Sequence, residues 1–196
     1  MSIHSHTALL IADFYGEQMS NLPHAITRNC VEKAVALRDA ARHAGVLICY
    51  SATVFRPGYI EVSDRNKMSS QHKRSGRLPN SDPQALIHPA IKPARTEPVV
   101  GKHRASAFYG TDLGLILSAN GVDTLMLLGY ATGGVILSTT RHAADADYRL
   151  LIVEDCCADN DPAVHDFLCQ KIFPRQADVV QSADVVSALG SSAQAG

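Results

Sequence analysis

The fold is decided by an apolar run that passes through a glycine-rich turn into a helical pattern, Thr124-Leu-Met-Leu-Leu-Gly-Tyr-Ala-Thr-Gly-Gly-Val-Ile-Leu-Ser-Thr139. Residues 124–129 form an apolar run, as expected of a strand that is buried on both faces. Residues 133–147 then have the pattern of a helix. A buried strand followed by a helix is the repeating unit of a parallel sheet that is covered by helices.

The same alternation continues on both sides of this unit. Further strands are predicted at residues 7–12, 46–53, 97–101, 148–154 and 178–181, and further helices at 24–44, 111–119, 162–172 and from 182 onward. We therefore predict one α/β domain over residues 1–196, with three α/β/α layers and a mainly parallel six-stranded sheet.

The composition narrows the class of protein. The 196 residues are 46% hydrophobic and 19% charged, with a formal net charge of -1, which is typical of a globular protein. No long run of one charge is present, so we expect neither nucleic acid nor a membrane as a partner. The N-terminus resembles neither a signal peptide nor a membrane span, and the expected location is the cytoplasm.

The cysteines indicate free thiols in the core rather than a framework of disulfide bonds. The chain has five of them, an odd number, and no C-x-x-C pair, which argues against disulfides and zinc ribbons. Buried thiols are the simplest interpretation. Cys156 and Cys157, at the end of an apolar run, could instead lie at the edge of a pocket.

A long segment at 54–95 interrupts the regular pattern. It contains five of the nine prolines and many polar residues. Connections of this length are usually functional lids or partner-binding arms, although a plain surface excursion is the alternative.

Polar side chains follow several of the predicted strands. In open parallel sheets, ligands bind beyond the carboxyl ends of the strands, so Asp13, Thr53, Lys102 and the turn at 129–132 should gather at one edge. Alone, Asp13 could cap a helix and Lys102 could be a solvated surface charge. Together they would form a proton-transfer pair, in which the lysine lowers the pKa of the acid and burial raises it.

The turn itself suggests anion binding. Gly133 and Gly134 lie directly before the predicted helix, where small residues let a ligand approach the backbone and the helix N-terminus offers N–H groups. An ordinary turn between a strand and a helix is the alternative interpretation.

Four motifs in this order resemble the isochorismatase-like hydrolases, also called the cysteine hydrolase family, over about residues 7–180. They are Ala8-Leu-Leu-Ile-Ala-Asp13, Gly101-Lys-His-Arg-Ala-Ser-Ala-Phe-Tyr-Gly-Thr-Asp-Leu113, the loop at 129–139, and Val153-Glu-Asp-Cys-Cys-Ala-Asp159. The resemblance implies that Asp13 is the catalytic acid–base residue and Lys102 its partner. It also implies a non-proline cis peptide near Tyr130-Ala131.

The resemblance also implies which side chains bind the substrate. The expected substrate-binding residues are Phe14, Arg56, Phe108, Tyr130, Ala131, Thr132, Gly133 and Gly134. Arg56 belongs to Phe55-Arg-Pro-Gly-Tyr-Ile-Glu-Val-Ser-Asp-Arg-Asn66, which resembles a subgroup motif; its guanidinium is a candidate carboxylate clamp, with a surface salt bridge as the alternative.

One position departs from the family pattern. The usual catalytic cysteine falls on Val135, and valine can be neither a nucleophile nor an acid–base group. Thr53, Val54 and Phe55 offer none of the ligands that the metal-binding members of the family carry after the second strand, so we expect no metal and no cofactor. True isochorismatases also lack the cysteine.

The leading hypothesis is therefore a cofactor-free, isochorismatase-type hydrolase of a small carboxylated metabolite. A non-catalytic binding protein that has kept the pocket is the alternative, and a third interpretation is an amidase that uses Cys156 or Cys157. The resemblance also suggests a homo-oligomer, with the 54–95 arm at an interface or over the pocket.

Overall fold

The computed structural model describes residues 6–76 and 82–193, and its centre is a six-stranded sheet with the strand order β3-β2-β1-β4-β5-β6. The strands are β1 Thr7–Ala12, β2 Leu47–Thr53, β3 Val99–Lys102, β4 Thr124–Tyr130, β5 Arg149–Ala158 and β6 Asp178–Val180. All five strand pairs are parallel, which confirms the predicted fold class.

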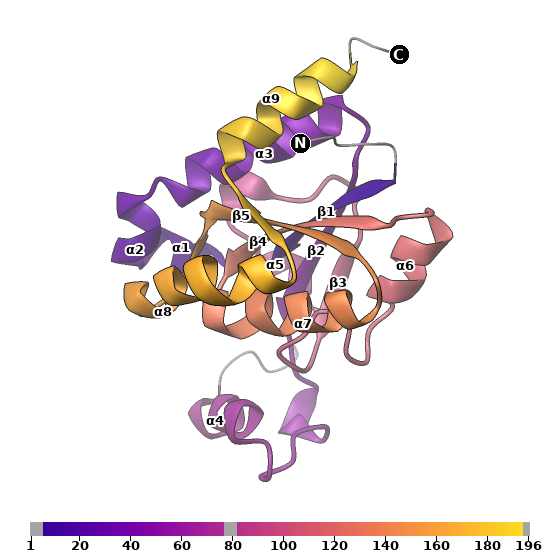
Figure 1. The fold of residues 1–196 in the computed structure, drawn as a ribbon. Coiled ribbons are helices and arrows are strands. Elements are labelled where there is room, and N and C mark those ends of the chain that lie inside the picture. The colour runs from indigo at the N-terminus through magenta and orange to yellow at the C-terminus, as the bar shows by residue number, and fades with distance from the viewer. Residues whose placement is uncertain (1–5, 77–81, 194–196) are drawn as a thin grey trace.

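Helices cover both faces of the sheet (Figure 1). One layer contains α1 Gly16–Asn21, α2 Pro23–Thr27, α3 Cys30–His43 and α9 Ser182–Ala193; the other contains α6 Leu113–Ala119, α7 Leu137–Asp145 and α8 Pro162–Phe167. No described helix is both long and apolar enough to cross a membrane.

Two predicted helices begin or continue differently from a regular α-helix. The predicted helix at 24–44 is divided at Asn29, which has a left-handed φ of 52°. The predicted helix at 133–147 opens with a π-helical turn at Thr132–Ile136 before α7 begins. A hydrophobic period does not report either change, because both preserve the buried face.

Gly129 lets β1 and β4 approach closely at the edge that carries the site. Its φ is 144°, and a Cβ at this position would lie 1.8 Å from the Ala12 carbonyl oxygen. Only glycine fits such a contact. The glycine therefore fixes where β4 turns into the following loop.

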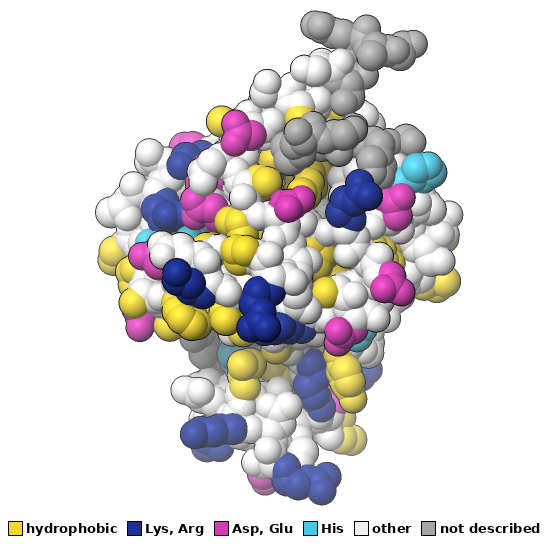
Figure 2. All heavy atoms as spheres, in the orientation of Figure 1, with side chains coloured by type: hydrophobic (Ala, Val, Ile, Leu, Met, Phe, Trp, Pro, Cys, Tyr) yellow, Lys and Arg dark blue, Asp and Glu magenta, His cyan; other side chains and the backbone are white. Residues whose placement is uncertain are grey.

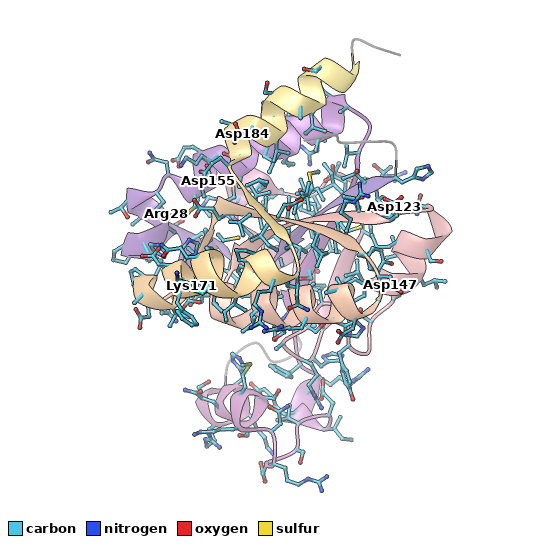
Figure 3. All side chains as sticks on the ribbon, viewed as in Figure 1. Arg28, Asp123, Asp147, Asp155, Lys171 and Asp184 are labelled. Carbon is cyan, nitrogen blue, oxygen red and sulfur yellow. The ribbon has the colours of Figure 1, made fainter. Side chains whose placement is uncertain are left out.

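Asp155 in the second half of β5 connects this strand to α9, and Figure 3 shows it beside the start of that helix. Its Oδ1 accepts from the Ser182 amide at 2.8 Å and its Oδ2 from the Ser182 hydroxyl at 2.8 Å. The carboxylate thus satisfies a helix N-terminal donor, which is the usual function of an acidic cap.

The arm forms a separate lobe. Residues 54–76 leave the body and build a small lobe around α4 Lys67–Ser75, and the chain returns through α5 Pro83–Leu86 (Figure 1). Residues 77–81 of the arm lie outside the described part. Among the charged side chains on the visible face of this lobe, Figure 2 shows mostly Lys and Arg, whereas the body carries both signs of charge.

Candidate functional site

A cavity of about 970 Å³ lies at the carboxyl edge of the sheet, between the body and the arm. Asp13 and Lys102 both line it, because β1 and β3 flank β2 and end at the same level. Lys102 Nζ lies 2.7 Å from Asp13 Oδ2, and the two side chains are 2% and 9% exposed. The sheet thus brings together the two groups that the sequence placed at different strand ends.

Thr53 at the end of β2 connects this pair. Its hydroxyl donates to Asp13 Oδ2 at 3.1 Å and accepts from Lys102 Nζ at 2.6 Å. Lys102 Nζ also donates to the Arg104 carbonyl at 3.1 Å. An ammonium has three protons, so Asp13, Thr53 and Arg104 saturate it and fix its position.

The surroundings of Asp13 favour the protonated form of its carboxyl group. Burial raises the pKa of its carboxyl above the ordinary value, and the Lys102 charge together with hydrogen bonds from Lys102, Thr53 and Tyr15 offsets only part of this rise. Oδ1 makes no hydrogen bond of standard geometry, although the Tyr15 hydroxyl is near enough to act on the pKa. Asp13 also has a left-handed φ of 50°, an uncommon backbone conformation that is frequent at functional sites.

Tyr15 is a member of the site that the sequence did not indicate. Its phenol oxygen accepts from the Thr53 amide at 2.8 Å, and Tyr15 lines the cavity. Burial and the Asp13 charge raise the pKa of this phenol well above its ordinary value, so it stays protonated. The only signal in the sequence was its place two residues after Asp13.

The end of β4 and the turn that follows it bring four residues to the cavity: Tyr130, Ala131, Gly134 and Val135. A cis peptide joins Tyr130 and Ala131. Val135 is 3% exposed, and its side chain offers the cavity only apolar surface. Val135, where the resemblance predicts the family's cysteine, therefore lines the same cavity as Asp13 and Lys102.

The backbone amides of Gly133 and Gly134 donate hydrogen bonds within the protein. Thr132 and Gly133 are not among the lining residues. The Gly133 amide donates to Asp159 Oδ2 at 2.6 Å, and the Gly134 amide donates to the Ala131 carbonyl at 3.0 Å. These two expected oxyanion donors therefore already have protein acceptors.

Three expected substrate-binding side chains lie elsewhere. Phe14 is fully buried in the core, where its ring meets His88 edge-on. The Arg56 side chain is 61% exposed. Its guanidinium nitrogen Nη1 lies 3.6 Å from Glu61 Oε1, in agreement with the salt-bridge alternative. Phe108 stacks on His142 with ring centroids 4.9 Å apart. None of the three lines the cavity.

The arm supplies much of the remaining wall. Phe55, Met68 and His72 come from its lobe, and Lys92 from the returning chain. The arm thus lies over the pocket, one of the two places expected for it. The sequence motif that ends at Asn66 was informative, because its first residue, Phe55, reaches the cavity although Arg56 does not.

None of the described cavity-lining residues is a cysteine. All five thiols are buried, and Cys156 and Cys157 are fully enclosed in the core. Burial raises the pKa of both thiols, which disfavours the reactive thiolate. The structure therefore does not support an amidase that uses either of these displaced cysteines.

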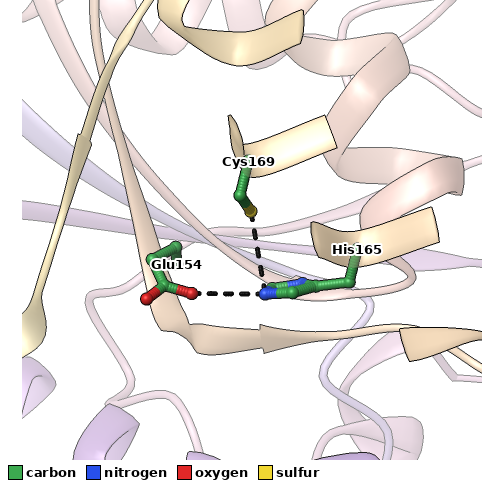
Figure 4. Close-up of side chains that lie close together, drawn as sticks. All are labelled: Glu154, His165 and Cys169. Atoms are coloured by element: carbon green, nitrogen blue, oxygen red, sulfur yellow. Dashed lines mark hydrogen bonds and ion pairs between the residues drawn. The ribbon is translucent and has the colours of Figure 1, made fainter. Parts of the chain in front are cut away.

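A second cluster lies behind the loop. Glu154, His165 and Cys169 converge, with Glu154 Oε2 3.2 Å and Cys169 Sγ 3.7 Å from His165 Nε2 (Figure 4). Although these atoms are of metal-binding types, the Arg28 guanidinium also pairs with Glu154 Oε2 and neutralises it.

The cluster is better explained as an anchor for the loop. Hydrogen bonds from His165, Gln181 and Arg28 outweigh the effect of burial and lower the pKa of Glu154 to about 2. On the other side of its ring, His165 Nδ1 lies 2.9 Å from the Thr132 hydroxyl. The hydrogen bonds thus run from Glu154 through His165 to the residue that begins the loop.

Comparisons with known proteins show the family to which the chain belongs. The family model described as Isochorismatase domain matches residues 7–184. Maleamate amidohydrolase of Pseudomonas putida is 29% identical over 159 residues, which are 81% of this chain and 74% of that protein. N-carbamoylsarcosine amidase of Arthrobacter sp is 32% identical over 160 residues, which are 81% of this chain and 60% of that protein.

A solved structure shares the whole architecture. An isochorismatase family protein from Burkholderia thailandensis superimposes with a TM-score of 0.79 at 26% identity, covering 96% of this chain and 98% of the other.

Proposed function

Because the chain belongs to the isochorismatase family of hydrolases, we propose that it hydrolyses a small carboxylated metabolite without a thiol nucleophile or a cofactor. In this reaction Asp13 is the general acid–base residue, and Lys102 orients it and stabilises negative charge. Isochorismatase-type cleavage of a vinyl ether is the concrete version of the proposal.

The observation that carries this proposal is the buried Asp13–Lys102 pair in a cavity that Val135 also lines. The family resemblance assigns the nucleophile position to this valine. Acyl transfer to the enzyme needs an activated nucleophile, and valine supplies none. Protonation of a vinyl ether needs only an acid that still carries its proton. Burial, which raises the pKa of Asp13, favours that state.

The charges of the cavity wall favour an anionic substrate. Besides Lys102, both Arg104 and Lys92 line the cavity, and neither forms an ion pair with a carboxylate of the described residues. A substrate carboxylate would complete the pairing of a cation there. We therefore assign carboxylate recognition to this wall rather than to Arg56.

The test is pyruvate release from isochorismate by the native protein, Asp13→Asn and Lys102→Met. Release that both variants reduce by orders of magnitude would support acid-catalysed hydrolysis. Maleamate and N-carbamoylsarcosine, assayed for ammonia, test amide hydrolysis in parallel. If a folded native protein turns over none of the three, the hydrolase proposal fails for these substrates. Calorimetric binding of isochorismate would then favour the non-catalytic alternative.

A further inference from the structure

A histidine and a glutamate form a second acid–base unit on the cavity wall. His103 directly follows Lys102 at the end of β3 and lines the same cavity. Its Nδ1 lies 2.6 Å from the Val54 carbonyl oxygen and 3.3 Å from Glu61 Oε1. The ring also packs against Phe55, with centroids 6.4 Å apart. These contacts hold the imidazole in one orientation.

The partners determine which nitrogen carries the proton. A carbonyl oxygen and a carboxylate oxygen are both acceptors, so Nδ1 of His103 must be the donor. In the neutral ring Nε2 then carries the lone pair. Within the described part of the chain, Nε2 makes no hydrogen bond, whereas both polar contacts of the ring are made through Nδ1.

Glu61 is itself held in place and ionised. Its Oε1 accepts from the Arg56 amide at 2.9 Å, and its side chain is 13% exposed. Burial acts to raise the pKa of Glu61, but the Arg56 amide and the neighbouring His103 and Arg56 charges lower it overall. A carboxylate in this state stabilises the imidazolium that forms when Nε2 takes a proton.

We propose that His103 is the general base that activates water in this cavity, with Glu61 as the residue that positions it. This inference deepens the proposed function and rests on it. Asp13 gives its proton to the substrate, but the attacking water must lose a proton to another group. His103 would supply that second, proton-accepting group.

The protons balance over the whole reaction. Asp13 transfers its proton to the terminal carbon of the vinyl ether, and the double-bond electron pair forms the new C–H bond. Water attacks the resulting oxocarbenium carbon and loses one proton to His103 Nε2. The hemiketal then breaks its C–O bond; the leaving oxygen takes the proton from His103, and the hemiketal hydroxyl returns a proton to Asp13.

Several charged groups surround the ring. Glu61 faces it from the arm, and Lys102 and Arg104 adjoin it on its own segment. His72 on α4 packs against Phe55, the ring that also contacts His103, and the centroids of His72 and Phe55 are 5.7 Å apart. A pH profile must therefore be compared between variants rather than assigned from one curve.

Kinetics provide the first test, using isochorismate with His103→Gln, Glu61→Gln and His142→Gln. We expect His103→Gln to reduce kcat by about 10²- to 10⁴-fold with KM changed less. Glu61→Gln should give a smaller loss and move the acidic limb of the kcat/KM profile to lower pH, because the imidazolium loses its counter-charge. His142 is exposed and outside the cavity, so its variant should match the native protein.

A second test needs no turnover. Two-dimensional ¹⁵N–¹H spectra of the histidine rings, taken above about pH 8 where neutral imidazole dominates, report the tautomer. We expect His103 with Nδ1 protonated in the native protein, and also in Glu61→Gln, because the Val54 carbonyl oxygen still accepts from Nδ1 there. An Nε2–H tautomer in the native protein overturns the inference, as does a His103→Gln variant with native kcat on a substrate whose turnover needs Asp13. If the native protein itself shows no turnover, the proposed function is refuted, and the tautomer measurement alone then decides this inference.

Discussion

Replacing Lys102 by methionine should expose the energetic importance of the buried pair. Methionine is similar in length and apolar, so it keeps most of the packing of a side chain that is only 2% exposed. At 2.7 Å and an effective dielectric constant of about 20, the lost attraction is about 6 kcal/mol, which is an upper limit. Breaking a buried pair from one side typically costs about 3–5 kcal/mol, and we expect a loss in that range near neutral pH.

The loss should depend on pH in a defined direction. The pKa of Asp13 is already raised in the folded state, and removal of the Lys102 charge raises it further. A carboxyl with a raised folded pKa lowers stability above its unfolded pKa, and this loss is complete only above the folded pKa. Below the unfolded pKa of about 4 the carboxyl is neutral in both states, so the loss should shrink as the pH falls.

Urea unfolding followed by circular dichroism at about pH 5 and about pH 8 measures both the loss and its pH dependence. Asp13→Asn provides the matched background, because a neutral amide needs no counter-charge. Lys102→Met should therefore be far less destabilising there than in the native protein. A loss below about 1 kcal/mol at both pH values, or an equal loss in the two backgrounds, would refute the reasoning.

Other positions give sharper single results. Gly129→Ala should destabilise by at least about 3 kcal/mol in urea unfolding, because its Cβ would meet the backbone of β1, whereas Gly190→Ala, in open space on α9, should gain about 0.5–1 kcal/mol. Asp155→Ala should lose about 1–2 kcal/mol by removing the cap of α9, measured in the same way, and an unchanged midpoint would contradict this. Val135→Cys should not release ammonia efficiently from nicotinamide. Light scattering at micromolar concentration should give an oligomer, and a monomeric mass would contradict that expectation.

The layers of the fold follow from short-range pattern. Uninterrupted apolar runs indicate strands buried on both faces, and the helical segments between them require parallel crossovers. The ends of elements were less accessible. β5 was predicted to end at Glu154 but continues to Ala158, because Asp155 turns inward to cap α9 and the polar pair does not end the strand.

The site was predictable where chain geometry alone places a residue. Asp13 and Lys102 meet because strand ends share an edge, a rule that needs no side-chain information. Phe14 and Phe108 were assigned by resemblance, but the direction of a side chain depends on packing that the pattern does not contain. His103 was missed for the same reason, since its role depends on Glu61, which lies 42 positions earlier on the arm.

The loop around Val135 shows why a thiol alone would not restore acyl transfer. A tetrahedral intermediate needs donors aimed at its oxygen, and losing one such donor typically costs about 10²- to 10³-fold in rate. Here the Gly133 amide is bonded to Asp159 and the Gly134 amide to the Ala131 carbonyl. The Glu154–His165 hydrogen bonds hold Thr132, at the start of the same loop, so the amides cannot turn without breaking a buried network. A cysteine at position 135 would have a base nearby in Asp13, but its intermediate would lack these donors.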